Sequence, residues 1–449
     1  MAKRTILLVG KSGRLDCMAE ALYESEGDKD IFILSEVFNR SLREKGEVIV
    51  GRSDDIEFVT KTALALEPQL AIIGPEEPLA AGVVDRLESI GVRCVGPTQQ
   101  LAQIETSKAF TRKLVDTYLP HLNLNPRYRI FCSTAGLQSF MEELGDFVVK
   151  PDGLTGGKGV RVLGEHFTDI SEAREYCDEL LFGGGTVVIE EKLEGEEFSY
   201  QSFTDGVTTV GTIPVQDHKR ANEGDQGPNT GGMGSYSCSD HLLPFLDKGA
   251  IEKAKLANQE VISALRLYFG QLYRGILYGG YIQTRNGLKL IECNARLGDP
   301  EAMNVLPIMG CDFLAVCDAI VTGTLNKLNI KFDAKSTVCK YVVPKDYPNA
   351  EQVKSPIYVP RPNVAKDKLR VYFGDVTTDE GTDYIRQSRS VAFVGIADTL
   401  DEAERIAEQA ASSVDGLVRH RRDIGTSAAI QKRIGNMEVV RSRKVASAA

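Results

Sequence analysis

Residues 150–160 read Lys-Pro-Asp-Gly-Leu-Thr-Gly-Gly-Lys-Gly-Val and place two lysines around a glycine-rich turn. The flanking residues, 147–149 and 160–162, have the apolar character of β-strands. Such a hairpin can fold its backbone N–H groups over a polyphosphate while the lysines neutralise the charge. A P-loop does not fit, because the Gly-x4-Gly-Lys-Ser/Thr frame is missing and a strand rather than a helix follows. Taken alone, the segment predicts either a phosphate-binding hairpin or an ordinary surface loop.

The overall composition is typical of a globular enzyme. With 449 residues, 42% hydrophobic and 26% charged, the chain is long enough for about three domains. The net charge of −10 is spread along the sequence, which argues against nucleic acid or an anionic membrane as a partner. No apolar run approaches the roughly 18–20 residues that span a bilayer, and the N-terminus has no signal-peptide pattern. The nine cysteines include no CxxC pair, so we expect neither disulfides nor a zinc site, and a cytoplasmic protein.

The pattern of strands and helices divides the chain into regions. We expect an N-terminal open parallel α/β domain over residues 1–105 and a central domain over 106–323, with a lid subdomain at about 125–195. A small β-rich domain is expected over 324–432, and a flexible tail over 433–449.

Alternation of strands and helices is clearest in the first region. Its predicted strands are residues 6–9, 31–34, 48–50, 70–73 and 92–95. Helical spacing covers residues 55–66 and 79–87. An open parallel sheet of this kind binds ligands at the carboxyl ends of its strands. Glycine-bearing turns follow two of these strands, at Gly10 and Gly74, although neither matches the dinucleotide motif GxGxxG.

Later regions have a different pattern. Residues 186–189, 198–203 and 208–213 resemble antiparallel strands, and helices are expected over 107–118 and 249–269. The last region combines strands at 337–343 and 390–394 with one helix at 400–412. The chain therefore combines α/β and α+β architecture.

A second candidate site lies near residue 290. Asn286-Gly287 is a strong type I′ turn signal, which predicts a β-hairpin on either side. In its second strand Glu292 and Asn294 are two residues apart, so their side chains share one face, about 7 Å apart at the backbone. Their oxygens suit Mg²⁺, and Gln283 on the partner strand is a possible supporting ligand. The alternative is an ordinary polar strand end.

Two further segments carry candidate residues. The strand that runs into Glu190 continues as an acidic linker, a pattern that can present backbone groups to adenine and Glu197 to a ribose; a solvated acidic turn fits equally well. The segment 216–234 contains Gln-Asp-His-Lys-Arg and a glycine-rich run. A long irregular segment inside a compact domain is more often a binding loop than filler.

Taken together and in order, these features resemble the ATP-grasp ligases. The matching features are Lys108 on its helix, Lys150 with the glycine loop, the acidic run from Glu190, and the Glu292/Asn294 pair. Within that superfamily the chain resembles the phosphoribosylamine–glycine ligases (glycinamide ribonucleotide synthetases), and some forms are nearer to archaeal members. The segments that carry this resemblance are GPEEPL at 74–79, SKAF at 107–110, QDHKR at 216–220, GPNTGGMG at 227–234 and RLGDPE at 296–301.

One segment departs from the family pattern. The family usually opens with Gly-x-Gly-Gly-Arg-Glu-His, whereas the aligned residues 10–16 here read Gly-Lys-Ser-Gly-Arg-Leu-Asp. The second glycine, the glutamate and the histidine are replaced. Gly10, Gly13 and Arg14 remain available for phosphate contacts.

The resemblance implies a central ATP-grasp fold and a reaction. ATP, glycine and 5-phosphoribosylamine would give glycinamide ribonucleotide, ADP and phosphate through glycyl phosphate, in de novo purine biosynthesis. Mg²⁺ or Mn²⁺ would assist ATP as the co-substrate, and the enzyme would act as a monomer or homodimer on small molecules alone.

The resemblance also implies roles for individual residues. ATP would bind at Lys108, Lys150, Gly153, Gly156, Gly157, Lys158, Gly159, Glu190, Glu191, Leu193 and Glu197. The other substrates would bind at Gly10, Gly13, Gly74, Pro75, Glu76, Pro78, Leu79, Asn229, Thr230, Gly231, Met233, Asp299, Pro300 and Glu301. The implied catalytic residues are Asp217, Lys219 and Arg296, and the implied metal ligands are Glu292, Asn294 and Gln283.

Three alternative functions compete with this reading. A different ATP-grasp ligase, such as a biotin carboxylase, shares the ATP-binding features but not the QDHKR and GPNTGGMG segments. A nucleotide-binding regulatory protein is favoured only by the altered opening loop. An NAD-dependent dehydrogenase depends on the N-terminal strand and helix pattern alone.

Overall fold

The computed structural model describes residues 3–443 except 155, 157–158, 351–353 and 362. Its N-terminal region is a five-stranded parallel sheet with the strand order β3-β2-β1-β4-β5. The strands are β1 (Arg4–Gly10), β2 (Lys29–Ser35), β3 (Glu47–Val50), β4 (Leu70–Ile73) and β5 (Arg93–Val95). The helices are α1 (Ser12–Glu24), α2 (Arg40–Arg43), α3 (Ile56–Leu66), α4 (Glu76–Ala81) and α5 (Val83–Ser89). This confirms the predicted open parallel α/β region.

The helix expected over residues 79–87 is divided in two. Gly82 lies between α4 and α5 with φ of +91°, a left-handed conformation that ends the first helix. The helical period of the sequence continues across this glycine, and the spacing of apolar residues alone could not reveal the break.

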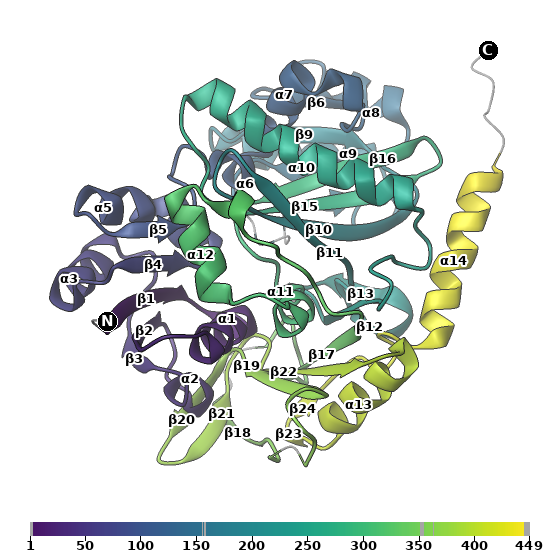
Figure 1. The fold of residues 1–449 in the computed structure, drawn as a ribbon. Helices are drawn as coiled ribbons and strands as arrows, with labels where there is room; N and C mark the ends of the chain where they lie inside the picture. The colour runs from purple at the N-terminus through teal and green to yellow at the C-terminus, as the bar shows by residue number, and fades with distance from the viewer. Residues whose placement is uncertain (1–2, 155, 157–158, 351–353, 362, 444–449) are drawn as a thin grey trace.

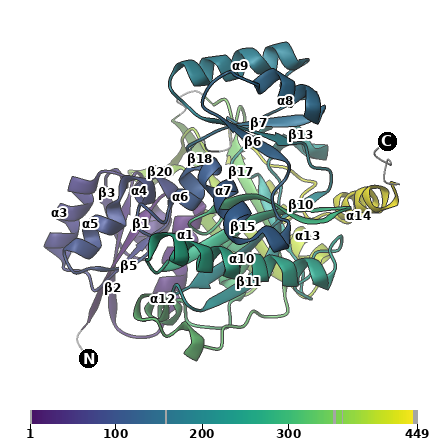
Figure 2. The same cartoon turned by 90° about the horizontal axis from the view of Figure 1, so that it is seen from above.

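A second layer forms a lid with its own sheet, β6-β9-β7-β8. Its elements are β6 (Tyr128–Phe131), α8 (Leu137–Leu144), β7 (Phe147–Pro151), β8 (Arg161–Val162), α9 (Ile170–Phe182) and β9 (Val187–Glu191). Its buried apolar side chains, among them Phe140, Phe147 and Ile189, form a core that is separate from the main core of the protein. In Figure 2 the lid lies at one end of the molecule, with α8 and α9 on its outer side.

Five central strands and four C-terminal strands form one continuous sheet. Its order is β16-β15-β10-β11-β14-β17-β22-β19, and β24 pairs with β17. The central members are β10 (Glu196–Thr204), β11 (Thr209–Asp217), β14 (Gly234–Ser237), β15 (Gly275–Thr284) and β16 (Gly287–Asn294). The C-terminal members are β17 (Ser336–Pro344), β19 (Leu369–Phe373), β22 (Val391–Ala397) and β24 (Val418–Arg419). β14 pairs with both β11 and β17 and so links the two parts.

Helices and smaller sheets complete the fold (Figure 1). The long helix α10 (Lys248–Phe269) packs on β10 and β15, and α13 (Leu400–Ser412) packs on β17 and β22. The connecting helices are α6 (Gln103–Thr106), α7 (Lys108–Tyr118), α11 (Ala302–Val305) and α12 (Phe313–Thr322), with short 3-10 turns η1 (Pro120–Leu122), η3 (Leu306–Ile308) and η4 (Leu325–Lys327). A four-stranded C-terminal sheet contains β20 (Val376–Asp379), β21 (Thr382–Ile385), β18 (Ser355–Tyr358) and β23 (Asp415–Gly416). In the described part of the chain no helix is both long and apolar enough to cross a membrane.

The hairpin predicted around Asn286-Gly287 is present, but its turn differs. Thr284 pairs with Gly287, so the two loop residues are Arg285 and Asn286. Of these residues only Gly287 has a positive φ, +100°, whereas a type I′ turn needs positive φ at both central positions. Gly287 is therefore the first residue of β16 and not a central residue of the turn.

The C-terminal segment is a helix where a flexible tail was predicted. α14 runs over Ser427–Ser442, begins with a Thr426 side-chain cap, and lies along one side of the molecule (Figure 1). Only Ile430 and Met437 of this helix are buried. Residues 433–442, expected to belong to a flexible tail, therefore lie in a helix. It packs on the main core through Ile430, Ile434, Met437 and Val440 and contacts other elements through polar side chains.

Candidate active site

The first part of the site lies where the N-terminal sheet changes its winding direction. β2 and β4 lie on opposite sides of β1, and ligands of open α/β sheets bind at such a point, beyond the carboxyl ends of the strands. The loops after β1 and β4 touch there, since a Cβ atom on Gly10 would lie 3.2 Å from Pro75 Cδ. Gly74 completes the β4 side by donating its backbone N–H to Val9 O at 2.9 Å. The structure thus brings together Gly10, Gly74 and Pro75.

Two predicted substrate residues in this loop have buried side chains. Pro78 and Leu79 are both buried in α4, and Leu79 belongs to the main hydrophobic core with an exposed fraction of 1%. Their side chains hold the loop in place.

The opening loop keeps the backbone shape of a glycine at a position occupied by serine. Ser12 has φ of +74°, a left-handed conformation that favours glycine. Gly13 lies against Tyr341 so closely that a Cβ atom would collide with the phenolic oxygen. The loop therefore leaves no room for a larger residue at position 13.

Asp16, which replaces the histidine of the usual family motif, is buried and structural. It forms an ion pair with Lys45 at 2.5 Å and accepts hydrogen bonds from Ser41 Oγ at 2.6 Å and the Phe373 backbone N–H at 2.7 Å. Because Phe373 belongs to β19, Asp16 connects the N-terminal α/β region to the C-terminal strands.

A buried cluster of opposite charges surrounds Arg296. Its guanidinium contacts Glu76 at 3.1 Å and Glu105 at 3.0 Å, and Arg14 lies 3.6 Å from Glu76. Although burial opposes ionisation, Arg296 and Arg14 lower the pKa of Glu76 to about 2. Burial raises the pKa of Glu105 to about 7 against the opposing effect of Arg296. The cluster holds Arg296 at the edge of the N-terminal loops.

The second part of the site is one face of the large sheet. Glu292 pairs with Gly280 and Asn294 pairs with Tyr278, so both side chains project from the same face. Gly280 makes space for the carboxylate, since a Cβ atom there would lie 3.1 Å from Glu292 Cγ. Within the residues that the structure describes, no three His, Cys, Asp or Glu side chains meet as a ready-made metal site. A cation here would have two protein ligands and would take the rest from substrate or water.

Gln283 is not brought to this pair. It pairs with Leu288 near the hairpin turn, three positions along β15 from Gly280. The alternation of side chains also places it on the opposite face from Glu292. The prediction of a supporting ligand at Gln283 is at odds with this register.

Lys219 connects two acidic residues of the sheet face. Its Nζ lies 3.6 Å from Glu292 Oε1 and 3.8 Å from Glu197 Oε2. Burial opposes the charge, but Glu292 and Glu197 raise the pKa of Lys219. Burial also acts to raise the pKa of Glu292, yet Lys219 and Lys150 keep that pKa below its usual range. Both groups are therefore charged at neutral pH.

Near Lys219 lies a group of buried polar atoms. Asp217 Oδ1 and Gln201 Nε2 are buried and have no hydrogen-bond partner among the described residues. Tyr278 donates to Glu301 Oε1 at 2.9 Å. Burial and the charge of Glu301 raise the pKa of Asp217 well above its usual range. An unpaired carboxyl oxygen of Asp217, with the Glu301 carboxyl group nearby, fits a small cationic group such as an ammonium.

The glycine-rich segment after β13 (Gln226–Asn229) is connected to Lys219 by hydrogen bonds. The backbone N–H and the hydroxyl of Thr230 both donate to Lys219 O at 2.8 Å. Asn229 ends β13, and Gly231 follows with its carbonyl accepting from Arg389 at 2.5 Å. Met233 is fully buried and accepts from the backbone N–H of Tyr341 at 3.0 Å.

Asp299 and Pro300 support this segment from the other side. Asp299 accepts from Tyr341 Oη at 2.7 Å and pairs with Arg389 at 3.2 Å. Burial opposes ionisation, but Arg389 and Arg14 lower the pKa of Asp299. Pro300 packs where a side chain on Gly232 would lie. These residues shape the site, and Asp299 has its charge already paired.

The third part of the site is a buried ion triad at the base of the lid. Glu190 receives two hydrogen bonds from Arg112, at 2.7 and 2.9 Å, and pairs with Lys150 at 2.7 Å. Burial alone would raise its pKa, but Arg112 and Lys150 lower the pKa of Glu190 to about 2. Its carboxylate is therefore paired with two cations and holds Lys150 in position.

A β-bulge directs a carbonyl group to the same triad. Ile291 is the extra residue where the pairing of β15 with β16 shifts. Its carbonyl accepts from Arg112 at 2.9 Å and from Lys150 at 3.3 Å. Bulges of this kind often lie next to active sites, and this one connects the metal-ligand strand to the lid.

The predicted glycine loop joins β7 to β8 and rests on the start of α7. Lys108 Nζ donates to Gly153 O at 2.7 Å, and Asp152 accepts from the backbone N–H of Ala109 at 3.1 Å. Burial and Lys150 lower the pKa of Lys108, opposed by Glu292. Lys108 therefore belongs to the same group of charges as Glu292 and Lys150.

Glycine is required at two described positions of this loop. Gly153 has φ of +106° and Gly156 has φ of +56°. Gly159 accepts a hydrogen bond from Tyr176 Oη at 2.9 Å. Two other predicted phosphate-binding residues, Gly157 and Lys158, lie outside the described residues.

The linker from the lid to the large sheet begins at Glu191. Glu191 accepts from the Arg127 backbone N–H at 2.8 Å, and the Lys192 N–H donates to Asp146 O at 3.1 Å. β9 is paired on both sides. The residues without sheet pairing are therefore those between β9 and β10, 192–195, and they include Leu193. A cavity of about 500 Å³ adjoins this region and has only Glu191 in common with the predicted site residues.

Arg112 and Glu105 were missed from the sequence. Arg112 lies one helical turn after Lys108 on α7, and Glu105 lies three residues before Lys108. Their closeness to a predicted phosphate-binding lysine was the only available signal. Their partners, Glu190 and Arg296, are remote in sequence.

Comparison with known families gives a consistent result along the chain. Three family models match, described as the N domain of phosphoribosylglycinamide synthetase over residues 4–105, its ATP-grasp (A) domain over 106–302 and its C domain over 337–427. The last match ends at the first residue of α14.

Similar proteins extend over the full length. A phosphoribosylamine–glycine ligase of Methanocaldococcus jannaschii is 45% identical, with 97% of this chain and 99% of the relative covered. That of Methanosarcina acetivorans is 43% identical, with 98% of each covered.

Solved structures confirm the fold, including the central ATP-grasp architecture. The Thermotoga maritima phosphoribosylamine–glycine ligase superposes with a TM-score of 0.79 at 24% identity, covering 93% of this chain and 99% of the other. A biotin carboxylase domain of Hydrogenobacter thermophilus 2-oxoglutarate carboxylase, in complex with MgADP and bicarbonate, has a TM-score of 0.69 at 14% identity, covering 97% and 94%.

Proposed function

Because the chain belongs to the phosphoribosylglycinamide synthetase family, it ligates glycine to 5-phosphoribosylamine with ATP, and we propose that it does so through glycyl phosphate at the site around Glu292 and Lys219. The observation that carries the proposal is the gathering of Lys108, Lys150 and Lys219 around one carboxylate on one sheet face. This arrangement suits the stabilisation of phosphate charge during phosphoryl transfer.

The proposed reaction has two steps. In the first, the glycine carboxylate oxygen attacks the γ-phosphorus of ATP, and the bond to ADP breaks. In the second, the amine of phosphoribosylamine attacks the carbonyl carbon of glycyl phosphate, loses a proton and releases phosphate. The products are glycinamide ribonucleotide, ADP and phosphate. Water must be kept from the acyl phosphate between the steps.

We assign the ATP phosphates to the lysines below the lid. Lys108 and Lys150 neutralise them, and Gly153, Gly156 and Gly159 of the β7–β8 loop cover them. The unpaired linker at Leu193 receives the adenine, and Glu197 receives the ribose. Glu190 acts indirectly, by holding Lys150 in place through the buried triad.

The residues present fit a magnesium ion. Glu292 and Asn294 supply two oxygen ligands on one face, and Mg²⁺ commonly takes one or two protein ligands together with substrate phosphates. When bound, the ion would neutralise charge on the β- and γ-phosphates. Mn²⁺, which accepts the same ligands, would be a substitute. The metal-bound nucleotide in the Hydrogenobacter domain supports this assignment.

We assign glycine and the amine to the part of the sheet face around Asp217 and Glu301. The buried, unpaired Asp217 Oδ1 suits the ammonium group of glycine, because this cation would offset the repulsion between Asp217 and Glu301. Arg296 would stabilise the acyl phosphate, and Lys219 would hold the carboxylate end of glycine near the metal. Every group named here belongs to one chain, so we propose that a monomer is sufficient for activity.

The phosphoribosyl group is assigned to the loops at the switch point. Gly10 and Gly74 lie at the carboxyl ends of β1 and β4, and Gly13 lies in the first turn of α1, where phosphates bind in open α/β folds. The Arg14 guanidinium adds a cation at the same edge.

The test is a phosphate-release assay with each substrate omitted in turn. We expect phosphate release from ATP that requires Mg²⁺, glycine and phosphoribosylamine, with one glycinamide ribonucleotide formed for each phosphate. Release no faster than background with all three substrates present would refute the assignment.

A further inference from the structure

Helix α14 is held against the rest of the protein by a narrow apolar row and by polar side chains. Ile430 and Met437 are buried, and Ile434 and Val440 pack against the same core. Arg433, Asn436 and Arg441 bond to other elements. The apolar row fixes the helix on the core, and the charged hydrogen bonds, which depend on geometry, connect it to particular residues.

Arg433 joins two elements that carry proposed site residues. One guanidinium nitrogen pairs with Glu196 at 3.1 Å, and the other pairs with Asp225 at 2.7 Å. Glu196 is the first residue of β10 and directly precedes Glu197. Asp225 lies at the tip of the hairpin formed by β12 (Arg220–Asn222), η2 (Glu223–Asp225) and β13 (Gln226–Asn229).

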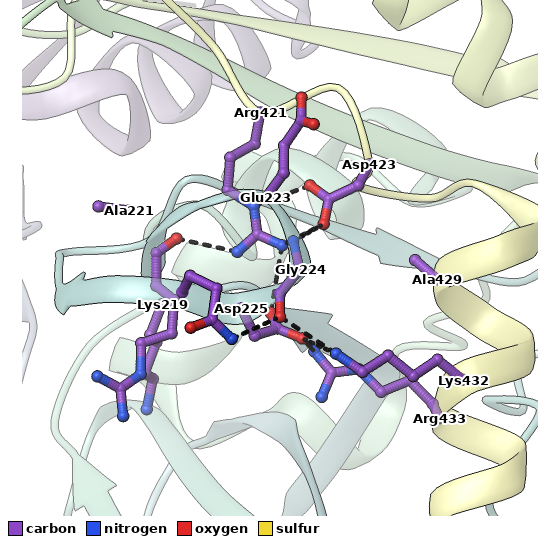
Figure 3. A network of polar contacts seen from close by, with 12 residues as sticks. Lys219, Ala221, Glu223, Gly224, Asp225, Arg421, Asp423, Ala429, Lys432 and Arg433 are labelled. Atoms are coloured by element: carbon purple, nitrogen blue, oxygen red, sulfur yellow. Dashed lines mark hydrogen bonds and ion pairs between the residues drawn. The ribbon is translucent and has the colours of Figure 1, made fainter. Parts of the chain in front are cut away.

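The same hairpin is held from its other side by the C-terminal region (Figure 3). Arg421 donates to Arg220 O at 2.9 Å and pairs with Asp225 at 3.2 Å. Asp423 accepts from the backbone N–H of Gly224 at 2.9 Å. As Figure 3 shows, Arg421 and Arg433 approach Asp225 from different elements.

The base of the hairpin is the part that carries Lys219. Lys219 directly precedes β12, and its carbonyl receives two hydrogen bonds from Thr230 just beyond β13. Its side chain reaches Glu197 and Glu292. A shift of the hairpin relative to β10 would therefore change how Lys219 lies over both carboxylates.

We propose that Arg433 is a positioning residue, which fixes the 220–229 hairpin to the start of β10 and so holds Lys219 in place for glycine. The proposal rests on the proposed function, because it takes Lys219 as part of the glycine site. When Arg433 is lost, Glu196 keeps Asn436 at 3.0 Å and Asp225 keeps Arg421 at 3.2 Å. β10 is in addition fixed by its pairing with β11 and β15, so the change in position falls on the hairpin. The predicted effect is therefore greater on glycine than on ATP.

The main experiment compares steady-state kinetics of Arg433→Gln with Arg433→Lys and the unaltered protein. Loss of a charged hydrogen bond that orients a binding group should raise KM for glycine about fivefold or more. The lysine variant can pair with only one carboxylate at a time, and its KM should lie between the other two. Arg441→Gln is the matched control on the same helix, since the Arg441 side chain donates to the Phe245 carbonyl and lies 4.0 Å from the exposed Asp247, away from the residues proposed for the site.

A binding measurement without turnover separates positioning from general loosening. Calorimetry with a non-hydrolysable ATP analogue should give a Kd for Arg433→Gln within about twofold of the unaltered protein. Asp225→Asn should raise KM for glycine as well, and the double variant should show less than the sum of the two effects. Circular dichroism checks that each variant is folded.

Several outcomes would overturn the proposal. These are an unchanged KM for glycine in folded Arg433→Gln, an equal rise in Arg441→Gln, and fully additive effects of the two substitutions. A folded variant with lower kcat and unaltered KM would point to a merely structural role. If the unaltered protein releases no glycine-dependent phosphate, the proposed function fails first, and that result is distinguishable from all of these.

Discussion

At the scale of single residues, Ser12 combines a side chain with a backbone conformation that favours glycine. Its φ of +74° lies in the left-handed region, where a residue other than glycine costs roughly 1–2 kcal/mol. The family pattern has glycine at this position, so the loop has kept the shape while the residue has changed.

We therefore expect Ser12→Gly to raise the free energy of unfolding by about 1 kcal/mol and Ser12→Val to lower it by about as much or more. Urea denaturation measures both. A loss of stability in Ser12→Gly would show that contacts of the hydroxyl group outweigh the backbone strain.

Glu190 is expected to be a stabilising charge with a distinct pH dependence. Arg112 and Lys150 lower its pKa to about 2, against an ordinary value of 4.5. Because the folded-state pKa is depressed, its stabilisation is complete above about pH 4.5 and is lost as the pH falls towards 2. Glu190→Gln should cost about 3 kcal/mol at pH 7, because two buried cations lose their partner.

The measurement is urea denaturation of both proteins between pH 7 and pH 3, and the stability difference should shrink as the pH falls through this window. A difference that stays constant with pH would mean that the Glu190 charge is not the source of the stabilisation.

Glu292 is expected to be essential for the metal-dependent step. Loss of even indirect metal contacts typically costs 10–100-fold, so Glu292→Ala should reduce turnover at least about 100-fold at low millimolar Mg²⁺. Gln283→Ala is the matched control, because Gln283 lies on the same sheet but on the other face. Equal losses in both variants would argue against a metal ligand at Glu292.

At the scale of elements, the predictable parts are those whose cause is local. The five N-terminal strands were found because apolar runs alternate with helical segments. In β1, for example, the apolar run 6–9 is fully buried. The turn before β16 was assigned to the wrong residues, because the positive φ of Gly287 belongs to the first residue of β16 and not to the turn. α14 was missed because its apolar row, Ile430, Ile434, Met437 and Val440, is short and lies among many charged residues.

The β7–β8 loop is the element most directly connected to chemistry. Gly153 has φ of +106°, which alanine adopts only with strain, and its carbonyl is held by Lys108. Gly153→Ala should therefore impair covering of the acyl phosphate and raise the ratio of phosphate released to glycinamide ribonucleotide formed.

Gly145→Ala is the control for this effect, because Gly145 also has a positive φ, +73°, in the same lid but ends α8. Both variants should lose similar stability, and only Gly153→Ala should uncouple the two products. An unchanged ratio in Gly153→Ala would remove the covering role of this loop.

At the scale of the whole molecule, the features that could not be predicted from the sequence are those that depend on pairing between distant segments. β14 and β17 are about one hundred residues apart, yet they pair and make one sheet of the central and C-terminal strands. The same limit applies to the site: the Glu292/Asn294 spacing was visible in one strand, but Arg112–Glu190 and Arg296–Glu105 join residues from distant segments. Only tertiary packing creates these pairs.

The separate cores predict different rates of hydrogen exchange. The lid has its own small core, whereas the other regions share one large core, and small cores generally open at lower free energy. Amide hydrogen exchange followed by mass spectrometry should show faster exchange in residues 128–191 than in β10, β15 and β17. Mg²⁺ with an ATP analogue should slow exchange in the lid. Equal protection of lid and large sheet without nucleotide would contradict this expectation.

The separate lid core also has a consequence for protein engineering. The chain enters the lid once, before β6, and leaves it once, after β9, so the lid is an exchangeable cassette that could be transplanted between relatives at residues 125 and 195. Such a transplant would need to retain the Arg112 contact with its Glu190, which is the point where host and graft must match. The C-terminal strands offer no such boundary, because cutting there would divide a single sheet.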